Sequence, residues 1–157
     1  MVENRLNISY NEYLVKFRNM INDLGLNNSV QKEYVLKLLF TCENHLNADD
    51  IQQMIKKEYN INIGIATVYR VLNLFEEMKI VRAITIQGQD SKVYEINLKS
   101  HHDHLVCIRC EKIVEFSSKE IEELQEHVAQ NRGFSLQSHN MIMYGICKEC
   151  QDELQHE

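Results

Sequence analysis

One amphipathic stretch near the middle of this 157-residue chain organises the elements around it: Gly64-Ile65-Ala66-Thr67-Val68-Tyr69-Arg70-Val71-Leu72-Asn73. Ile65, Val68 and Leu72 recur at steps of three and four residues, which predicts a helix with one apolar face. Tyr69 and Arg70 then point largely away from that face. We therefore expect a helix that presents an aromatic ring and a guanidinium group outward.

Three more helices are predicted before this stretch. The first begins at a capping box of Ser9 and Glu12 and continues to Gly25, the second follows Ser29, and the third follows Asn47. After the stretch come two strand-like runs, 80–86 and 92–96, separated by a five-residue loop that contains a glycine, which indicates a hairpin. Helices followed by a hairpin give the element order of a winged helix-turn-helix.

The character of the chain changes after about residue 97. Strand-like runs lead through Cys107 and over 113–116, a helix is predicted from a cap at Ser117 and Glu120 to Gly133, and 134–146 alternate toward another strand. The predicted fold class is α+β. An N-terminal winged helix-turn-helix domain covers 1–96 and includes an N-terminal helical arm. Residues 97–100 form a hinge, and a small C-terminal α/β domain covers 101–157.

The net formal charge of −6 is unevenly distributed. Residues 1–94 hold eleven basic and eleven acidic side chains, whereas residues 95–157 hold six basic and twelve acidic ones. A neutral N-terminal half can still present a basic face, and the residues available for it are Arg5, Lys16, Arg18, Lys32, Arg70 and Lys92. The acidic C-terminal half is the half suited to cations.

Four of the five cysteines form two Cys-x-x-Cys pairs, Cys107 with Cys110 and Cys147 with Cys150. This spacing is typical of tetrahedral zinc sites, in which each turn supplies two thiolates. A dithiol redox centre is the alternative, but no thioredoxin-like context surrounds either pair. We predict a structural Zn²⁺ site at these four cysteines and assign Cys42 to the core.

A second candidate is the segment His101-His102-Asp103-His104. In a strand, alternate side chains face opposite sides, so His101 and Asp103 would serve one site while His102 and His104 serve another. Further ligands would come from the acidic half, which offers Glu95, Glu115, Glu122, Glu123, Glu126 and His139. A solvated polar loop remains the simpler alternative, whereas nitrogen and carboxylate donors would suit exchangeable iron, manganese or zinc.

The outward face of the helix after Gly64 is a candidate DNA-contact surface. Arginine can pair with guanine or reach phosphate, and an aromatic ring can pack on a thymine methyl group. The candidate contacts are Tyr69 and Arg70, with Thr67, Lys16 and Lys32. An ordinary amphipathic helix with a solvated face is the alternative.

Several protein classes are excluded or disfavoured. No apolar run approaches the ~20 residues of a membrane span, and the start of the chain lacks the pattern of a signal peptide, so we expect a cytoplasmic protein. A zinc deaminase would carry Pro-Cys-x-x-Cys, and this chain contains no proline. A zinc deaminase is therefore disfavoured, and a metal-storage or zinc-ribbon interaction protein remains an alternative.

Three segments together closely resemble the ferric uptake regulator family, in order over roughly residues 12–150. They are the stretch 64–73 quoted above, His101-His102-Asp103-His104-Leu105-Val106-Cys107-Ile108-Arg109-Cys110, and Tyr144-Gly145-Ile146-Cys147-Lys148-Glu149-Cys150. The resemblance implies a homodimeric, metal-dependent transcription factor. Its winged helix would bind double-stranded DNA, and its C-terminal domain would dimerise.

The resemblance also implies three metal sites. The four paired cysteines match the structural zinc site. The regulatory site is matched by His45, Glu95, His102, His104 and Glu115, and an additional site by His101, Asp103, Glu122 and His139. The residue types alone could supply neither His45 nor the choice among the glutamates.

The resemblance further suggests which metal is sensed. Peroxide-sensing members typically have Asp at the positions of Glu95 and Glu115, so this chain is expected to respond to Fe²⁺, replaceable by Mn²⁺ or Zn²⁺. It would act chiefly as a repressor of iron-uptake genes at AT-rich inverted repeats. Zinc- or peroxide-responsive regulation within the same family is the alternative, and a zinc-dependent enzyme a more remote one.

Overall fold

The computed structural model describes residues 8–86, 92–98 and 101–155, and it divides the chain into two compact units, Met1–Ser100 and His101–Glu157. The predicted loop at 87–91, most of the N-terminal arm with Arg5, and half of the predicted hinge lie outside the described residues. Among those described, no helix is long and apolar enough to span a bilayer.

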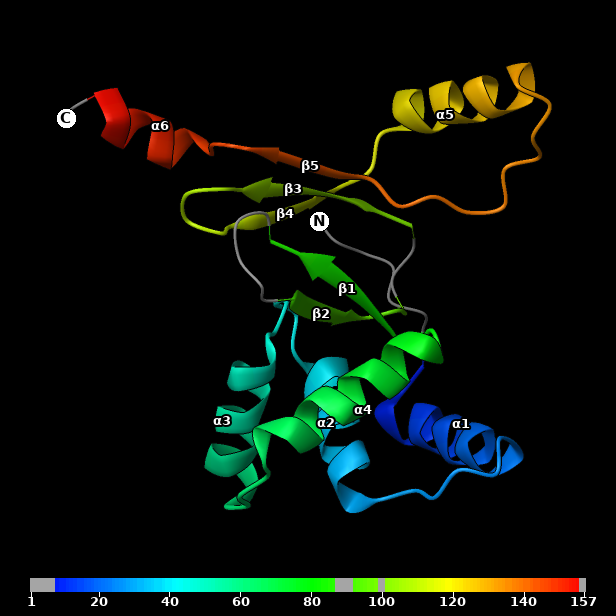
Figure 1. Cartoon of the computed structure of the whole chain (residues 1–157), viewed down its shortest axis with the longest axis vertical. Helices are drawn as coiled ribbons and strands as arrows, with labels where there is room; N and C mark the ends of the chain where they lie inside the picture. The colour runs from blue at the N-terminus through cyan, green and yellow to red at the C-terminus, as the bar shows by residue number, and fades with distance from the viewer. Residues whose placement is uncertain (1–7, 87–91, 99–100, 156–157) are drawn as a thin grey trace. The chain divides into compact units, whose positions relative to one another are not determined.

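The first unit consists of four helices and a two-stranded antiparallel sheet (Figure 1). The helices are α1 (Tyr10–Asp23), α2 (Val30–Thr41), α3 (Ala48–Tyr59) and α4 (Ile65–Glu77). The strands are β1 (Val81–Thr85) and β2 (Lys92–Ile96), in a register that places Val81 opposite Ile96.

Local caps determine where these helices begin. Ser9 and Glu12 form the predicted capping box of α1, Ser29 accepts a hydrogen bond from the backbone N–H of Lys32, and Asn47 accepts one from that of Asp50. Each cap satisfies a backbone donor that the first turn of a helix leaves unpaired. The predicted starts of all three helices are therefore confirmed.

The apolar faces of the four helices share one core with β1 and β2. On α4 the buried face consists of Val68, Val71, Leu72 and Phe75, while Tyr69 is 43% exposed. The periodicity predicts Val68 and Leu72 correctly, but it misses Val71, and Ile65 is only partly buried. Phe17 of α1 packs edge-to-face on Phe75, with ring centroids 5.5 Å apart. This packing fixes which face of α4 remains outside.

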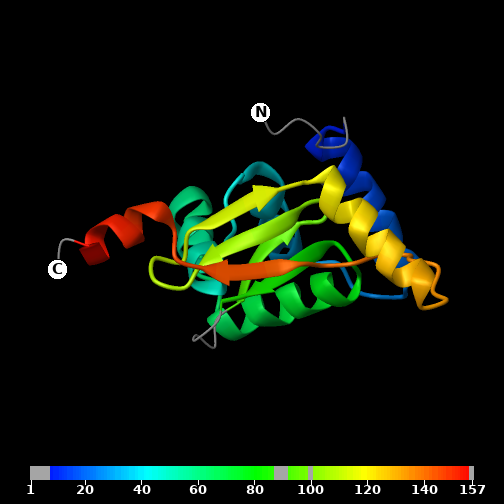
Figure 2. The same cartoon turned by 90° about the horizontal axis from the view of Figure 1, so that it is seen from above.

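The second unit is a three-stranded mixed sheet with two helices (Figure 2). Its strands are β3 (Asp103–Cys107), β4 (Ile113–Phe116) and β5 (Ile142–Gly145), and β3 lies between an antiparallel β4 and a parallel β5. The helices are α5 (Lys119–Asn131) and α6 (Lys148–Gln155).

Three details of the second unit differ from expectation. The cap of α5 is Ser118 rather than Ser117, because the Ser118 side chain accepts the hydrogen bond from Ile121. Residues 134–141 are irregular, so the alternating stretch forms a strand only over β5. Helix α6 was not predicted; it begins directly at the second cysteine pair, and the backbone N–H of Gln151 bonds to the carbonyl of Cys147.

Candidate metal centres

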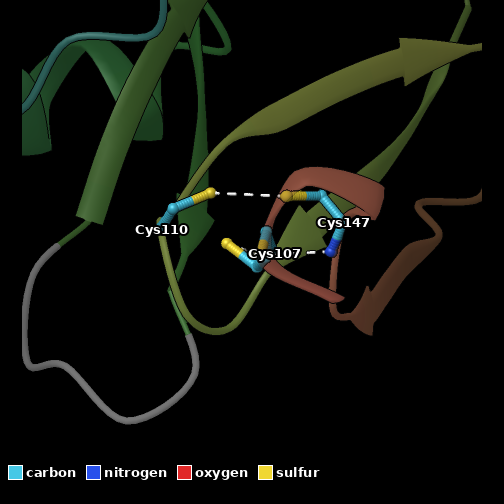
Figure 3. A group of neighbouring side chains, drawn as sticks. Cys107, Cys110 and Cys147 are labelled. Atoms are coloured by element: carbon cyan, nitrogen blue, oxygen red, sulfur yellow. Dashed lines mark hydrogen bonds between the residues drawn. The ribbon is translucent and has the colours of Figure 1, made fainter. Parts of the chain in front are cut away.

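The two Cys-x-x-Cys turns bring all four cysteines into one group. Cys107 ends β3, Cys110 lies in the following turn, and the second pair lies at the start of α6. Their sulfur atoms all lie within 4.8 Å of one another, and Cys107 Sγ lies 3.9 Å from Cys150 Sγ. Cys110 Sγ and Cys147 Sγ, which face each other in Figure 3, are 3.6 Å apart. Four thiolates about 2.3 Å from one tetrahedral Zn²⁺ would be about 3.8 Å apart, so the spacing fits that ion.

The backbone prepares one of these thiols for metal binding. Cys107 Sγ accepts a hydrogen bond from the backbone N–H of Cys147 at 3.3 Å (Figure 3). Backbone N–H groups of Cys110 and Cys147 lower the pKa of Cys107 to about 6. Burial instead raises the pKa of Cys150. A divalent cation would stabilise the deprotonated, thiolate form of all four cysteines, and the thiolate is the form that binds zinc.

Charged side chains join the two turns, and sequence reasoning assigned them no role. Lys112 Nζ lies 2.8 Å from Glu149 Oε1, and Arg109 Nη1 donates to the Cys150 carbonyl at 3.3 Å. The hydrogen bond from Lys112 lowers the pKa of Glu149 to about 2. Opposite charges placed one or two residues from a cysteine were the available signal in the sequence.

A second group combines imidazoles and carboxylates within the second unit. His101, Glu122 and His139 offer ligand atoms within 4.8 Å of one another. Glu122 Oε1 lies 3.2 Å from His101 Nδ1 and 3.4 Å from His139 Nε2. Of the other acidic candidates on α5, Glu123 pairs with Lys119 instead.

Asp103 adds an anionic group to this second site. Its carboxylate is fully buried, Oδ1 lies 3.9 Å from His139 Nε2, and neither oxygen accepts a hydrogen bond from any described residue. A buried carboxylate needs a compensating charge or donor. A divalent cation held by Asp103, His101, Glu122 and His139 would supply that charge, so the donor set fits a metal ion.

The remaining candidate ligands are divided between the two units. In the first, His45 Nε2 lies 3.6 Å from Glu95 Oε2, and both side chains are largely buried. The backbone bridge between Leu46 and Tyr94 brings them together, because His45 is the neighbour of Leu46 in the sequence and Glu95 is the neighbour of Tyr94. This unit therefore carries one nitrogen and one carboxylate ligand side by side.

The second unit carries the other three of these ligands. His104 lies opposite Glu115 across β3 and β4, and the rings of His102 and His104 are 4.8 Å apart. His104 is almost fully buried. Cys42 joins none of the groups and is the half-buried C-cap of α2.

The candidate DNA contacts lie in the first unit, and they differ in exposure and in hydrogen bonding. Tyr69 and Arg70 are exposed on α4, and Arg70 Nε donates to the Ala66 carbonyl at 3.3 Å. Lys16 is exposed on α1, Thr67 is half-buried, and the Lys32 ammonium donates to the Asn27 carbonyl.

Arg18, a member of the expected basic face, forms a two-pronged ion pair with Glu33. Arg18 Nε and Nη2 each lie 2.7 Å from a Glu33 carboxylate oxygen. This pairing offsets the charge of Arg18 within the protein itself.

We compared the sequence and the fold of this chain with those of known proteins. Residues 23–144 match the model of the ferric uptake regulator family. The ferric uptake regulation protein of Campylobacter jejuni is 39% identical over 148 residues, which cover 94% of each chain. The structure of the Helicobacter pylori ferric uptake regulator Fur, described as having three functional metal-binding sites, is 36% identical, with a TM-score of 0.85, over 95% of this chain and 97% of that one.

A functionally distinct relative matches as well. The Campylobacter jejuni peroxide stress regulator is 31% identical, with a TM-score of 0.64, over 91% of this chain and all of that one. Fold likeness therefore does not separate iron from peroxide regulators. The family-model match and the identities over most of the chain show that this protein belongs to the ferric uptake regulator family of metal-dependent transcription regulators.

Proposed function

We propose that this protein is an Fe²⁺-responsive repressor of iron-uptake genes, which binds AT-rich inverted repeats as a homodimer when its regulatory site is metallated. The observation that supports the proposal is that the five residues matched to the regulatory site by family resemblance are divided between two compact units. His45 and Glu95 belong to the unit that contains α4, and His102, His104 and Glu115 belong to the other.

Ligands on two units give metal a means to control DNA binding. A metal ion, when bound, supplies one centre for nitrogen and oxygen donors, and donors from both units would then hold a single relative orientation. The two recognition helices of a dimer must reach major-groove segments about 34–36 Å apart, so orientation sets affinity for the operator. The metal shifts that equilibrium only through its higher affinity for the DNA-competent state.

The donor set supports iron over peroxide sensing. Glu occupies both positions, 95 and 115, at which the peroxide-sensing branch of the family typically has Asp. Imidazole and carboxylate donors suit Fe²⁺, and they accept Mn²⁺ and Zn²⁺ as well. A zinc-responsive regulator of the same family is therefore the second candidate.

We assign different tasks to the other two metal groups. The four cysteines would hold a structural Zn²⁺, because thiolates at that spacing bind zinc in closed tetrahedral sites. His101, Asp103, Glu122 and His139 would form an additional site, supported by the buried Asp103 carboxylate. The domain limits we propose remain 1–96, 97–100 and 101–157.

Exposed apolar surface on the second unit supports a homodimer. Leu105 lies opposite Val114 on β4 and opposite Met143 on β5, and these three side chains form a row across one sheet face. They are 36–43% exposed, and α5 contains no buried residue. A second copy of the chain would cover this surface.

DNA contact is assigned to α4 and the basic residues near it. We propose that Tyr69 and Arg70 contact base edges of the DNA. Thr67, Lys16 and Lys32 would contact its sugar-phosphate backbone. The N-cap of α4 is Gly64, which forms no side-chain capping bond, so a phosphate could approach the backbone N–H groups there.

The relatives matched are regulators, and we propose no enzymatic activity and no small-molecule substrate. A regulator of this kind acts where the chromosome is, so we place it in the cytoplasm. A zinc-dependent hydrolase or deaminase is the rejected alternative.

The decisive experiment is an anaerobic titration of a labelled AT-rich inverted repeat with the protein, followed by fluorescence anisotropy. Apo protein, with only its zinc retained, is compared with protein given Fe²⁺, Mn²⁺ or Zn²⁺, and scrambled DNA is the specificity control. We expect Fe²⁺ to tighten operator binding at least tenfold and Mn²⁺ to reproduce part of that effect. Equal affinity of apo and Fe²⁺-loaded protein would contradict the proposal.

A matched pair of variants locates the effect. His45→Ala should abolish the response to Fe²⁺, because it removes a ligand from the DNA-binding unit. His127→Ala, at an exposed position on α5 outside every ligand group, should leave the response intact. A normal Fe²⁺ response in His45→Ala would assign regulation to another site.

A further inference from the structure

Three contacts other than the zinc ligands join the two cysteine turns. Lys112 Nζ lies 2.8 Å from Glu149 Oε1, Arg109 Nη1 donates to the Cys150 carbonyl, and the Cys147 N–H donates to Cys107 Sγ. Figure 3 shows the last of these, with the sulfurs of Cys110 and Cys147 pointing toward one another. These contacts accompany a sulfur spacing that fits zinc ligands.

We propose that the ion pair of Lys112 and Glu149 is a clasp that retains zinc by keeping the two cysteine turns together. This inference rests on the proposed zinc site. Lys112 lies two residues after Cys110, and Glu149 lies between Cys147 and Cys150. Because each partner lies within two residues of a ligand in the sequence, moving the turns apart to release an ion would break the pair.

Charge supports the same role for both partners. Four thiolates and one Zn²⁺ carry a net charge of −2, and Glu149 adds another negative charge beside them unless a cation faces it. Lys112 is that cation, and it comes from the opposite turn. Both side chains are at least half exposed, and exposed ion pairs change an equilibrium by about two- to fivefold.

A zinc-release assay on the full-length protein tests the clasp. Zinc-loaded wild-type protein and the variants Lys112→Gln, Glu149→Gln and the double variant are mixed with excess colorimetric chelator, and the rate of zinc transfer is followed. We expect all three variants to release zinc two- to fivefold faster, and the double variant to be no faster than the single ones. At about 1 M salt, where screening acts within about 3 Å, the differences should shrink.

The control is a second exposed ion pair that lies away from the cysteines. Lys119 and Glu123 on α5 are 3.4 Å apart, and the variant with Gln at both positions should release zinc at the wild-type rate. Faster release from that variant would show a general effect of surface charge and would contradict the clasp.

Other outcomes separate the clasp from a simple effect of net charge and from the zinc site itself. If net charge alone mattered, the two single variants would shift the rate in opposite directions and the double variant would match the wild type, which overturns the clasp. Unchanged rates in all variants of a zinc-loaded protein overturn it too, while leaving the zinc site standing. A wild-type protein that binds no zinc would overturn both.

Discussion

At the scale of single residues, Arg70 tests the DNA-contact surface most directly. It is exposed on α4 and is not among the buried residues of that helix. We expect Arg70→Ala to weaken operator binding about 10- to 100-fold, because a base or phosphate contact is lost. Zinc content and dimerisation should stay unchanged; anisotropy, metal analysis and ultracentrifugation measure the three properties.

The matched control removes a positive charge elsewhere. Lys119→Ala changes an exposed position of α5 and should leave operator affinity within about twofold. Equal loss of DNA binding, zinc and dimer in Arg70→Ala would instead give Arg70 a structural role.

Cys107 tests the link between metal and folding. Cys107→Ser should eliminate the bound zinc and lower the free energy of unfolding by about 3 kcal/mol or more, because metal-binding energy at such a site is also folding energy. Zinc analysis with urea denaturation measures both. Cys42→Ser, at a half-buried position outside the group, should keep its zinc; a zinc-free Cys107→Ser protein of wild-type stability would contradict a structural site.

At the scale of elements, the ion pair of Arg18 and Glu33 ties α1 to the start of α2. The Arg18 guanidinium holds the pKa of Glu33 below its usual value. The pair therefore contributes full stability above about pH 4.5 and loses it as the pH falls through the lowered pKa in the folded protein. Because Arg18 is half exposed, the contribution is about 1 kcal/mol or less at neutral pH.

The variant Glu33→Gln isolates that contribution. We expect it to be less stable than the wild type at pH 7, and the difference to shrink as the pH falls below about 4.5, as measured by urea denaturation at a series of pH values. Glu58→Gln, at an exposed position near the end of α3, controls for the general effect of removing a carboxylate. A stability difference that persists unchanged at pH 3 would rule out the ion pair as its cause.

The apolar row on the sheet makes a separate prediction. Leu105→Glu places a charge between Val114 and Met143, and it should convert the dimer to monomers that keep their zinc. Sedimentation velocity and metal analysis would show both effects. Val15→Glu, at an exposed apolar position on α1, should remain dimeric; a dimeric Leu105→Glu protein would place the interface elsewhere.

Sequence alone could predict those elements whose start signals are local. The N-caps Ser9, Ser29 and Asn47 act within one helical turn, so the first residues of their helices can be predicted to within a residue or two. Residues 134–141 have a strand-like alternation but pair with no neighbouring strand along that length, and pairing depends on distant residues. Helix α6 is short and carries no capping residue of the usual kind, so its start could not be seen.

The candidate sites divide in the same way. The spacing of the four cysteines predicts their metal site, whereas the ion pair of Lys112 with Glu149 depends on two turns that meet only in the folded chain. His45 is a single histidine far from the histidine segment, and only family resemblance assigned it a role. The pairing of His45 with Glu95 depends on the bridge from Leu46 to Tyr94, which no local pattern reveals.

At the scale of the whole molecule, metal binding and DNA binding must be linked reciprocally. If Fe²⁺ raises affinity for the operator by some factor, operator DNA must raise affinity for Fe²⁺ by the same factor. We expect that factor to be at least ten, and competition with a calibrated chelator, with and without operator duplex, measures it. An Fe²⁺ affinity that is the same with and without operator DNA would refute the coupling. A scrambled duplex is the control.

Helix α5 buries no residue within its own chain, and its apolar side chains Leu124 and Val128 are 63% and 52% exposed. An isolated helix of this length is marginal in water, so its stability would come from a second copy and would rise with protein concentration. Glu122 lies on this helix. If the proposed site at His101, Asp103, Glu122 and His139 holds a metal ion, its occupancy would therefore rise with protein concentration.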